Sequence, residues 1–191
     1  EKHILEGKQA PAFLIPDENS EEVSLEYFKG RWVVLYFYPK DNTPGCTIEA
    51  KDFSSYKQEF ERFNTVILGV SPDSAESHTK FIRGKDLTIT LLSDEHKKSM
   101  KEYHTWGKKK FMGKEYMGVI RSTFLVNEKG KIFKADKGIL FFDELNRCPE
   151  KVQNALLQVL EEKKATIGSY DVDFDIDFIF VGTENPEDSS T

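Results

Sequence analysis

The chain has 191 residues, of which 38% are hydrophobic and 31% are charged, and its net charge is −6. This composition excludes low-complexity disorder and collagen-like repetition. No apolar run approaches the length of about 18 residues expected of a membrane span, and the amino end lacks the pattern of a secretory signal. The densest basic run, residues 108–110, is read as a solvated loop. We therefore expect a globular, cytoplasmic protein with no nucleic-acid and no membrane partner.

Charge is unevenly distributed along the chain. Residues 1–136 carry 22 basic and 21 acidic side chains, whereas residues 137–191 carry 5 basic and 12 acidic ones. This shift predicts a compositional boundary near residue 136, with a first domain over residues 1–136 and an appended segment over residues 137–191.

The first elements predicted are two strands at residues 32–38 and 65–70. Both are continuous apolar runs rich in β-branched and aromatic residues, which is typical of central strands that are covered on both faces. Between them, residues 47–63 place aromatic side chains at spacings of three and four, which predicts one helix. A strand, a helix and a second strand in this order form a right-handed crossover with parallel strands, so a layered α/β sheet is expected.

The later pattern adds further helices and strands to this α/β fold. The ranges predicted are a helix at 77–83, strands at 88–92, 121–126 and 131–135, a helix at 95–103, and a hairpin turn at 127–130. In the tail, we predict a strand at 138–142, a helix beginning near Pro149 and another strand at 170–181.

Cys46 is the first candidate for chemistry. It follows a predicted strand and a loop that contains Pro39, Thr43 and Pro44, and it lies at the start of the predicted aromatic-faced helix. Unpaired backbone N–H groups and the helix dipole at that end favour a thiolate over a thiol, which makes the sulfur a nucleophile. The alternative is a buried structural cysteine, which is the common fate of a free Cys.

The residues around Cys46 also carry a family resemblance. Residues 39–46 read PKDNTPGC and match the PxxxTxxC pattern of peroxiredoxins, and YFYPKDNTPGCTIEAKDF closely resembles the bacterioferritin comigratory protein (PrxQ) branch. The resemblance continues through LGVSPDSAESHTKF, LLSDEHKKSMKEYHTWG, KKFMGKEYMGVIRSTFLV and NEKGKIFKA, to about residue 135. It implies a thioredoxin-like fold, with a central mixed sheet flanked by helices, to which the tail adds an α/β fragment.

The same resemblance implies a thiol-dependent peroxidase of hydrogen peroxide and organic hydroperoxides. Cys46 is then the peroxidatic cysteine, which becomes a sulfenic acid. Thr43 offers its hydroxyl to the peroxide, Pro39 shields the pocket, and Arg121 supplies a guanidinium beside the sulfur. Two alternatives are a catalytically impaired, noncatalytic interaction scaffold and a nucleotide-dependent remodelling factor.

The resolving thiol is not fixed by the sequence. Many members of the branch carry a resolving cysteine five residues after the first, but Lys51 occupies that position here. An external thiol such as thioredoxin or glutathione, Cys148, or another subunit is left to resolve Cys46. The sequence leaves a monomer and a dimer both open. Cys148 lies beyond the family-like region, and a disulfide requires Cα atoms within about 7 Å.

The remaining chemistry-bearing residues favour no cofactor and no metal. The histidines have no metal-ligand spacing and are read as surface or internally hydrogen-bonded side chains: His3, His78, His96 and His104. Trp106 and Phe111 are expected to pack or to wall the pocket.

The tail resembles a different family. GILFFDELNR is similar to the Walker B segment of MoxR-type AAA+ ATPases, with Asp143 and Glu144 as its carboxylates, and Asn185 stands where such proteins keep a sensor asparagine. None of the Gly-Lys pairs of the sequence continues into the GxxxxGK[ST] loop that binds a triphosphate, so a vestigial fragment without ATPase activity is expected. The sequence also ends at Thr191, where the lid part of such an ATPase is still to come.

Two further interpretations concern the tail. Alternating aspartates at residues 171–177 lack the Gly and Glu of an EF-hand, so an edge strand with a charged face is favoured over a calcium site. Residues 150–162 carry an apolar stripe, and one hypothesis is that this segment takes the place of the terminal helix of the peroxiredoxin fold.

Overall fold

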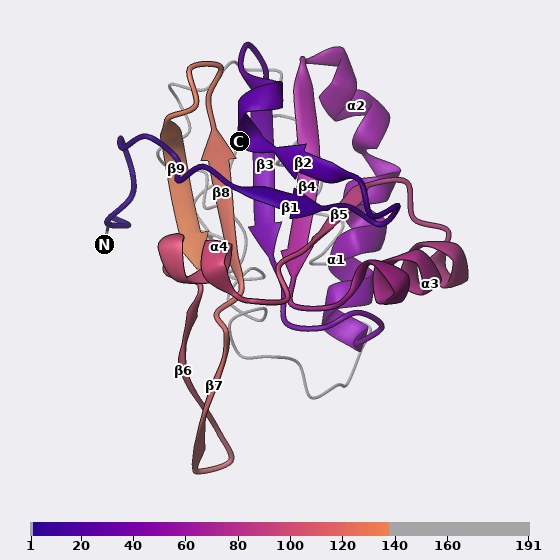
Figure 1. Ribbon diagram of the computed structural model, residues 1–191, viewed down its shortest axis with the longest axis vertical. Coiled ribbons are helices and arrows are strands. Elements are labelled where there is room, and N and C mark those ends of the chain that lie inside the picture. The colour runs from indigo at the N-terminus through magenta and orange to yellow at the C-terminus, as the bar shows by residue number, and fades with distance from the viewer. Residues whose placement is uncertain (1, 138–191) are drawn as a thin grey trace, which may run out of the picture.

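A five-stranded sheet forms the centre of the computed structural model, which describes residues 2–137 (Figure 1). The strand order is β5–β4–β3–β8–β9. Strands β3, β4 and β5 are parallel, whereas β8 runs antiparallel to both β3 and β9. The strands are β3 (Trp32–Phe37), β4 (Thr65–Ser71), β5 (Thr90–Ser93), β8 (Ser122–Val126) and β9 (Ile132–Lys137). The predicted mixed sheet is therefore confirmed.

Strand β3 lies in the middle of the sheet, and all of its residues are buried. Successive side chains of a strand point to opposite faces. Accordingly, Val34 and Tyr36 belong to one buried cluster, and Leu35 and Phe37 belong to the other. The continuous apolar run of the sequence thus reflects a strand that is covered on both faces.

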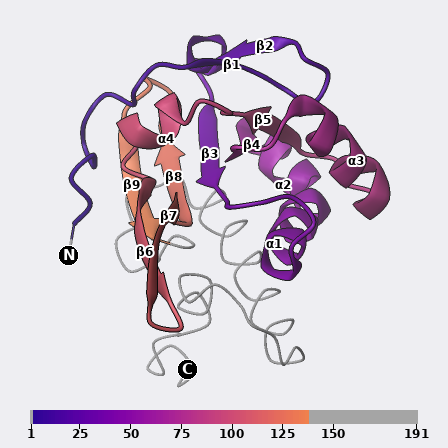
Figure 2. The same ribbon diagram turned by 60° about the horizontal axis from the view of Figure 1, so that its bottom comes forward.

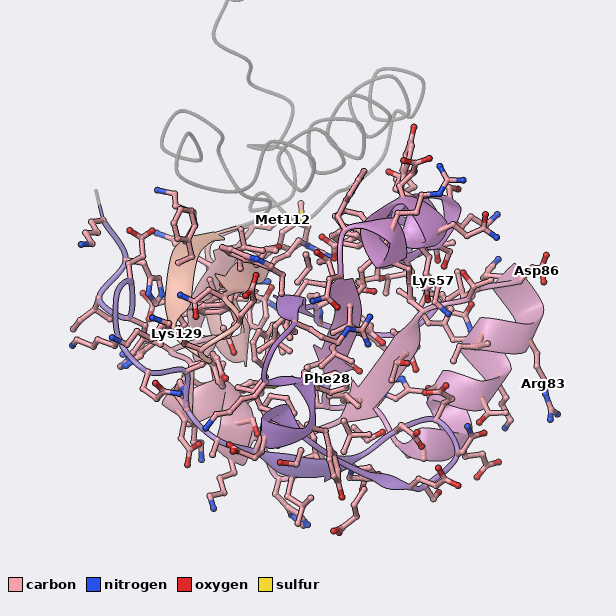
Figure 3. The ribbon with its side chains drawn as sticks, turned by 90° about the horizontal axis from the view of Figure 1, so that it is seen from above. Phe28, Lys57, Arg83, Asp86, Met112 and Lys129 are labelled. Carbon is pink, nitrogen blue, oxygen red and sulfur yellow. The ribbon has the colours of Figure 1, made fainter. Side chains whose placement is uncertain are left out.

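Three helices cover the face that carries Tyr36 (Figures 1 and 2). They are α1 (Pro44–Ser55), α2 (Lys57–Arg62) and α3 (Ala75–Lys85). Each contributes one fully buried phenylalanine to the cluster, namely Phe53, Phe60 and Phe81. Figure 3 shows Lys57 and Asp86 on the side of the molecule formed by α2 and α3, with Lys129 on the opposite side.

The other face of the sheet is covered by the amino-terminal segment and by shorter elements. These are the strand pair β1 (Leu14–Pro16) and β2 (Glu22–Ser24), the 3-10 helix η1 (Leu25–Phe28) and the helix α4 (Lys98–Glu102). Leu25, Met100 and Tyr103 belong to the same buried cluster as Phe37. The amino-terminal strands β1 and β2 were not predicted, because each has only three residues.

The single helix predicted at residues 47–63 is two helices. The first begins at Pro44 and ends at Ser55, and the second starts at Lys57. Between them, Tyr56 has φ −102° and ψ 7°, and its N–H contacts the carbonyls of Asp52 and Ser54. Both helices pack on the same buried cluster, so the apolar spacing continues across Tyr56. The periodicity of the sequence alone therefore could not indicate the break between the helices.

The other elements predicted within residues 2–137 are present with shifted ends. The helix predicted at residues 77–83 is α3, which begins after the N-cap Ser74. The helix predicted at residues 95–103 is shortened to α4, because Lys97 and His104 adopt positive φ values of 61° and 59°. The predicted turn at residues 127–130 joins β8 to β9, with Gly130 at φ 80°.

An antiparallel hairpin of β6 (Trp106–Phe111) and β7 (Lys114–Val119) was not predicted, and it extends away from the sheet (Figure 1). Its two-residue turn is formed by Met112 and Gly113, both with positive φ, as a type I′ turn requires. The basic residues 108–110 therefore lie in a strand rather than in a loop. The expected packing of Phe111 is wrong because 43% of this residue is exposed, whereas Trp106 is half-buried against the core.

The elements predicted in the tail lie outside the described residues. These are the strands at residues 138–142 and 170–181, the helix beginning near Pro149, the calcium alternative at residues 171–177 and the substitution of the terminal helix by residues 150–162.

Candidate active site

The loop between β3 and α1 leads Cys46 into the start of a helix. Thr43 is the N-cap residue, with φ −82° and ψ 153°, and Pro44 is the first helical residue. A proline suits that position because it has no N–H group that would need a partner. Cys46 is consequently the third residue of α1, as the sequence predicts for a cysteine at a helix start.

The side chain of Thr43 does not cap this helix. Its Oγ1 atom donates a hydrogen bond to the carbonyl of Lys40 at 3.0 Å. The first backbone hydrogen bond of the helix runs from the Thr47 N–H to the Thr43 carbonyl at 2.9 Å. The N–H groups of Gly45 and Cys46 come before this bond and have no carbonyl partner within the helix. They lie at the positive end of the helix dipole, where they favour a negative charge.

Arg121 lies directly beside the Cys46 sulfur. Its Nη2 atom donates to Sγ at 3.1 Å, and its Nη1 atom donates to Oε1 of Glu49 at 2.8 Å. The three residues are almost fully buried, at 2%, 1% and 0% exposure for Arg121, Cys46 and Glu49. A buried guanidinium that is held by a carboxylate presents a fixed cationic hydrogen-bond donor to the sulfur.

Tyr36 forms part of the apolar wall around this group. It is buried, its ring stacks on Phe53 with centroids 4.8 Å apart, and its hydroxyl has no hydrogen-bond partner among the described residues. Burial raises the pKa of Tyr36 well above its ordinary value, and the negative charges of Glu49 and Cys46 raise it further, while Arg121 lowers it. Tyr36 therefore stays neutral beside the sulfur.

Gly69 gives Tyr36 the space it occupies. The two residues are paired in the register of β3 and β4. A Cβ atom on Gly69 would lie 2.7 Å from the Tyr36 hydroxyl and 2.8 Å from Leu91. The absence of a side chain at Gly69 is thus a packing requirement of the wall behind Cys46.

The structure brings some of the predicted site residues together. Cys46 and Arg121 are in contact, although 75 positions separate them. Thr43 and Pro39 are half-buried in the loop before α1. The Thr43 hydroxyl donates to the Lys40 carbonyl of the same loop. The predicted tail residues lie outside the described residues: Asp143, Glu144, Cys148 and Asn185.

Three site residues were missed in the sequence. Glu49 lies one helical turn after Cys46, a spacing that places the two on one face of α1. A charged residue on an otherwise apolar face is a signal that could have identified Glu49. Asp41 and His78 have no comparable signal, because their contact joins residues 37 positions apart.

A cysteine at a helix start, with a buried arginine on its sulfur and a mixed sheet behind it, is an arrangement that occurs in thiol enzymes. Comparison with known proteins specifies the class. The model of the AhpC/TSA family matches residues 6–135. The chain therefore belongs to the AhpC/TSA family, and it is a peroxiredoxin, a thiol-dependent peroxidase with a thioredoxin-like fold.

Relatives at the level of sequence and structure agree. Peroxiredoxin Bcp of Bacillus subtilis is 46% identical over 67% of this chain and 82% of that protein. Peroxiredoxin Bcp of Escherichia coli is 41% identical over 66% of this chain and 81% of that protein. A solved structure of the Xanthomonas campestris bacterioferritin comigratory protein, described for alkyl peroxide reduction, has 32% identity and a TM-score of 0.65, covering 76% of this chain and 90% of that one.

A second family model, that of the ATPase family associated with various cellular activities (AAA), matches residues 109–191. The match agrees with the resemblance to an AAA+ ATPase predicted from residue 137 onward. It also covers β7, β8 and β9, although β8 and β9 belong to the peroxiredoxin sheet. Within residues 2–137, no helix has the length and apolar character needed to cross a bilayer.

Proposed function

We propose that Cys46 is the peroxidatic thiol of this peroxidase. The observation that carries the proposal is the 3.1 Å contact from Arg121 Nη2 to Cys46 Sγ at the beginning of α1. The sulfur thus has a cationic partner, and it also lies at the positive end of a helix. A structural cysteine in an apolar core would need neither.

The proposed reaction begins with attack of the Cys46 thiolate on one oxygen of the peroxide. A sulfur–oxygen bond forms and the oxygen–oxygen bond breaks, so that the leaving oxygen takes the electron pair. The proton of the attacked oxygen passes to the leaving oxygen, which departs as water or an alcohol. Cys46 is oxidised to a sulfenate, which takes a proton from water to become a sulfenic acid. Arg121, held by Glu49, stabilises the negative charge as it moves between sulfur and oxygen.

Thr43 and Pro39 have supporting roles in this proposal. Because the Thr43 hydroxyl donates its proton to the Lys40 carbonyl, its oxygen offers free lone pairs. These lone pairs suit the proton of an incoming peroxide and orient it toward the sulfur. Pro39 has no N–H group and is half-buried, so it shields the loop from water without adding a competing donor.

An external thiol is proposed to complete the cycle. The thiol attacks the sulfenic acid at Cys46, which releases water and forms a mixed disulfide, and a second thiol then releases Cys46. Cys46 is the one cysteine within residues 2–137, and the position five residues later is Lys51. Thioredoxin or glutathione fits this role in a reducing cytosol, where protein thiols stay free. Resolution by Cys148 and resolution by another subunit are the alternatives.

The carboxyl-terminal segment is proposed to be catalytically inert. It is the acidic part of the sequence, it is similar to a Walker B segment, and the printed sequence holds no GxxxxGK[ST] loop. We therefore assign peroxide chemistry to residues 1–136 and no nucleotide chemistry to residues 137–191.

The test compares the parent protein with a Cys46→Ser variant in peroxide consumption, with dithiothreitol as the reductant. The parent is expected to consume peroxide, and the variant is expected to lose that activity while keeping the parent's circular dichroism spectrum. A Cys148→Ser variant serves as the matched control and is expected to remain active with this small reductant. Retained activity in Cys46→Ser would overturn the proposal.

A further inference from the structure

Asp41 is a charged residue in the middle of the loop that carries Pro39 and Thr43, yet only 6% of it is exposed. Aspartate is rarely buried to this extent unless it is paired. The roles proposed above for the loop do not use Asp41. A buried aspartate needs hydrogen-bond partners, so we examined the groups around Asp41 and their relation to the active site.

The carboxylate of Asp41 has three side-chain partners. Its Oδ1 atom accepts from the Tyr38 hydroxyl at 2.7 Å. Its Oδ2 atom accepts from the Ser77 hydroxyl at 2.8 Å and lies 2.8 Å from Nδ1 of His78. Tyr38 follows β3, whereas Ser77 and His78 belong to α3. One carboxylate thus ties the loop to two different elements of the fold.

The backbone of Asp41 is held as well. Its N–H donates to Oδ2 of Asp73 at 2.8 Å, and the same oxygen accepts from the Ser71 hydroxyl at 2.7 Å. Ser71 is the last residue of β4. The loop is therefore fixed at Asp41 from both the side chain and the main chain. These bonds also occupy the carboxylate and imidazole atoms that cluster within 4.8 Å of one another in Asp41, Asp73 and His78.

His78 is fully buried, and the atoms around its ring indicate where its ring hydrogens lie. Its Nε2 atom lies 2.9 Å from the carbonyl of Leu92, and a carbonyl only accepts, so Nε2 carries hydrogen. The contact between Nδ1 of His78 and Oδ2 of Asp41 also requires one proton between the two atoms. That proton makes the contact a hydrogen bond in place of two opposed lone pairs.

We propose that Asp41 is a positioning residue for the reaction of peroxide at Cys46. Thr43 donates to the carbonyl of Lys40, the residue next to Asp41, so a shift of Asp41 moves the Thr43 hydroxyl with it. A displacement of about 1 Å in a reacting group can cost about 100-fold in rate. The proposal rests on the peroxidatic role of Cys46, and it assigns the geometry of the peroxide-binding loop to a buried network centred on Asp41.

The test uses two rates measured on the same reduced protein. The first is the second-order rate constant for oxidation of Cys46 by hydrogen peroxide. The second is the rate constant for its alkylation by iodoacetamide, in which the attacked atom is a carbon that carries no O–H group for Thr43 to orient. Asp41→Ala is expected to lower the oxidation rate constant about 10- to 100-fold while alkylation stays within about threefold or rises. Such a split is not expected from a change in the thiolate fraction, because that change moves both rates together.

A conservative variant tests the hydrogen bonds themselves. In Asp41→Asn, the amide oxygen can accept from Tyr38 and the amide nitrogen can donate to a neutral Nδ1 of His78. The oxidation rate constant is expected to recover to within about fivefold of the parent, because the loop is again held. Tyr38→Phe keeps the ring and removes one donor, so it provides a milder variant, with an expected loss of about three- to tenfold, if Asp41→Ala does not fold.

The matched control is Glu6→Ala. Glu6 is buried to a similar degree at 9% exposure, and it accepts from the Ala135 N–H and pairs with Lys134 away from the loop. In Glu6→Ala, the rate constant for oxidation of Cys46 is expected to equal that of the parent, even if the variant is less stable.

Three results would overturn the proposal. They are an Asp41→Ala oxidation rate constant within about twofold of the parent, an equal fall of both rates, or an Asp41→Asn variant that is no better than Asp41→Ala. Cys46→Ser is run alongside these variants. If it still consumes peroxide, the proposed function fails, whereas a failure confined to Asp41 leaves the role of Cys46 intact.

Discussion

Arg121 donates to the Cys46 sulfur at 3.1 Å and, with its other terminal nitrogen, to Glu49 at 2.8 Å. The guanidinium thus joins a position just before β8 to two positions on α1. Its planar shape allows both hydrogen bonds at once, which a lysine ammonium on a flexible stem does not reproduce.

Arg121→Lys is therefore expected to lower the rate constant for oxidation of Cys46 by hydrogen peroxide by about 100-fold, because one fixed donor of the transition state is lost. Stopped-flow measurement of that rate constant checks the prediction. Arg83→Lys, at an exposed position of α3 (Figure 3), is the control and is expected to stay within about twofold of the parent. A normal rate in Arg121→Lys would show that any cation at this position suffices.

Glu49 has a different role, since it orients Arg121 without needing to touch the sulfur. Glu49→Ala is expected to destabilise the protein by about 3–5 kcal/mol, because it leaves a buried guanidinium without its carboxylate. Glu49→Gln keeps an oxygen acceptor for Nη1 and is expected to lose less. Urea denaturation of both variants measures the difference, and equal losses would contradict the assigned role.

The Thr43 hydroxyl is expected to act on the peroxide and not on the sulfur. Thr43→Val removes the oxygen but keeps the shape of the side chain, and it is expected to slow oxidation by about 100-fold while alkylation by iodoacetamide is nearly unchanged. Thr43→Ser restores the oxygen and is expected to recover most of the rate. If valine and threonine reacted equally fast with peroxide, the proposed contact would not exist.

The packing of Gly69 against Tyr36 leads to a stability prediction. Gly69→Ala places a methyl group 2.7 Å from the Tyr36 hydroxyl, in a wall with no free space, so a loss of about 1–3 kcal/mol or more is expected. Gly84→Ala is the matched control, since Gly84 lies in α3 with nothing within 4 Å of the added Cβ. That change is expected to stabilise the helix by about 0.5–1 kcal/mol. Urea midpoints of the two variants should move in opposite directions.

Buried tyrosines predict a loss of stability at high pH. Burial raises the pKa of Tyr36, Tyr38 and Tyr103 above the ordinary value, so the folded protein keeps these protons longer than the unfolded chain does. The stabilisation is complete below the unfolded pKa of about 10 and is lost as the pH rises through and above that value. Urea unfolding at increasing pH is the measurement.

The Tyr103→Phe variant isolates one of these contributions. Its stability relative to the parent is expected to be constant below about pH 9 and to improve above about pH 10, because Phe has no proton to lose. A difference that stayed constant throughout would contradict the assignment.

Much of this fold was accessible from the sequence. The runs at the centres of β3 and β4 are continuously apolar, which is typical of strands covered on both faces. The β6–β7 hairpin escaped prediction because its exposed strands carry no apolar face, and the turn at Met112 and Gly113 was the one local signal. The break at Tyr56 was hidden because Phe53 and Phe60 pack on the same cluster on either side of it.

The candidate site divides in a similar way. Cys46 was identified from its position at a predicted helix start, whereas Thr43, Pro39 and Arg121 were identified through a family resemblance. The contact of Arg121 with Cys46 is present in the structure. The network around Asp41 could not be predicted, because its members come from β4, α3 and two loops that only the completed fold brings together. Hydrogen bonds between residues far apart in the chain produce no repeating pattern in the sequence.

The most direct test is mass spectrometry of the reduced protein after one equivalent of hydrogen peroxide, with dimedone present to trap a sulfenic acid. We predict a dimedone adduct at Cys46 and none at Cys148 when no other thiol is present. An unmodified Cys46, with the oxygen found at Cys148 or nowhere on the chain, would contradict the assignment of the peroxidatic sulfur.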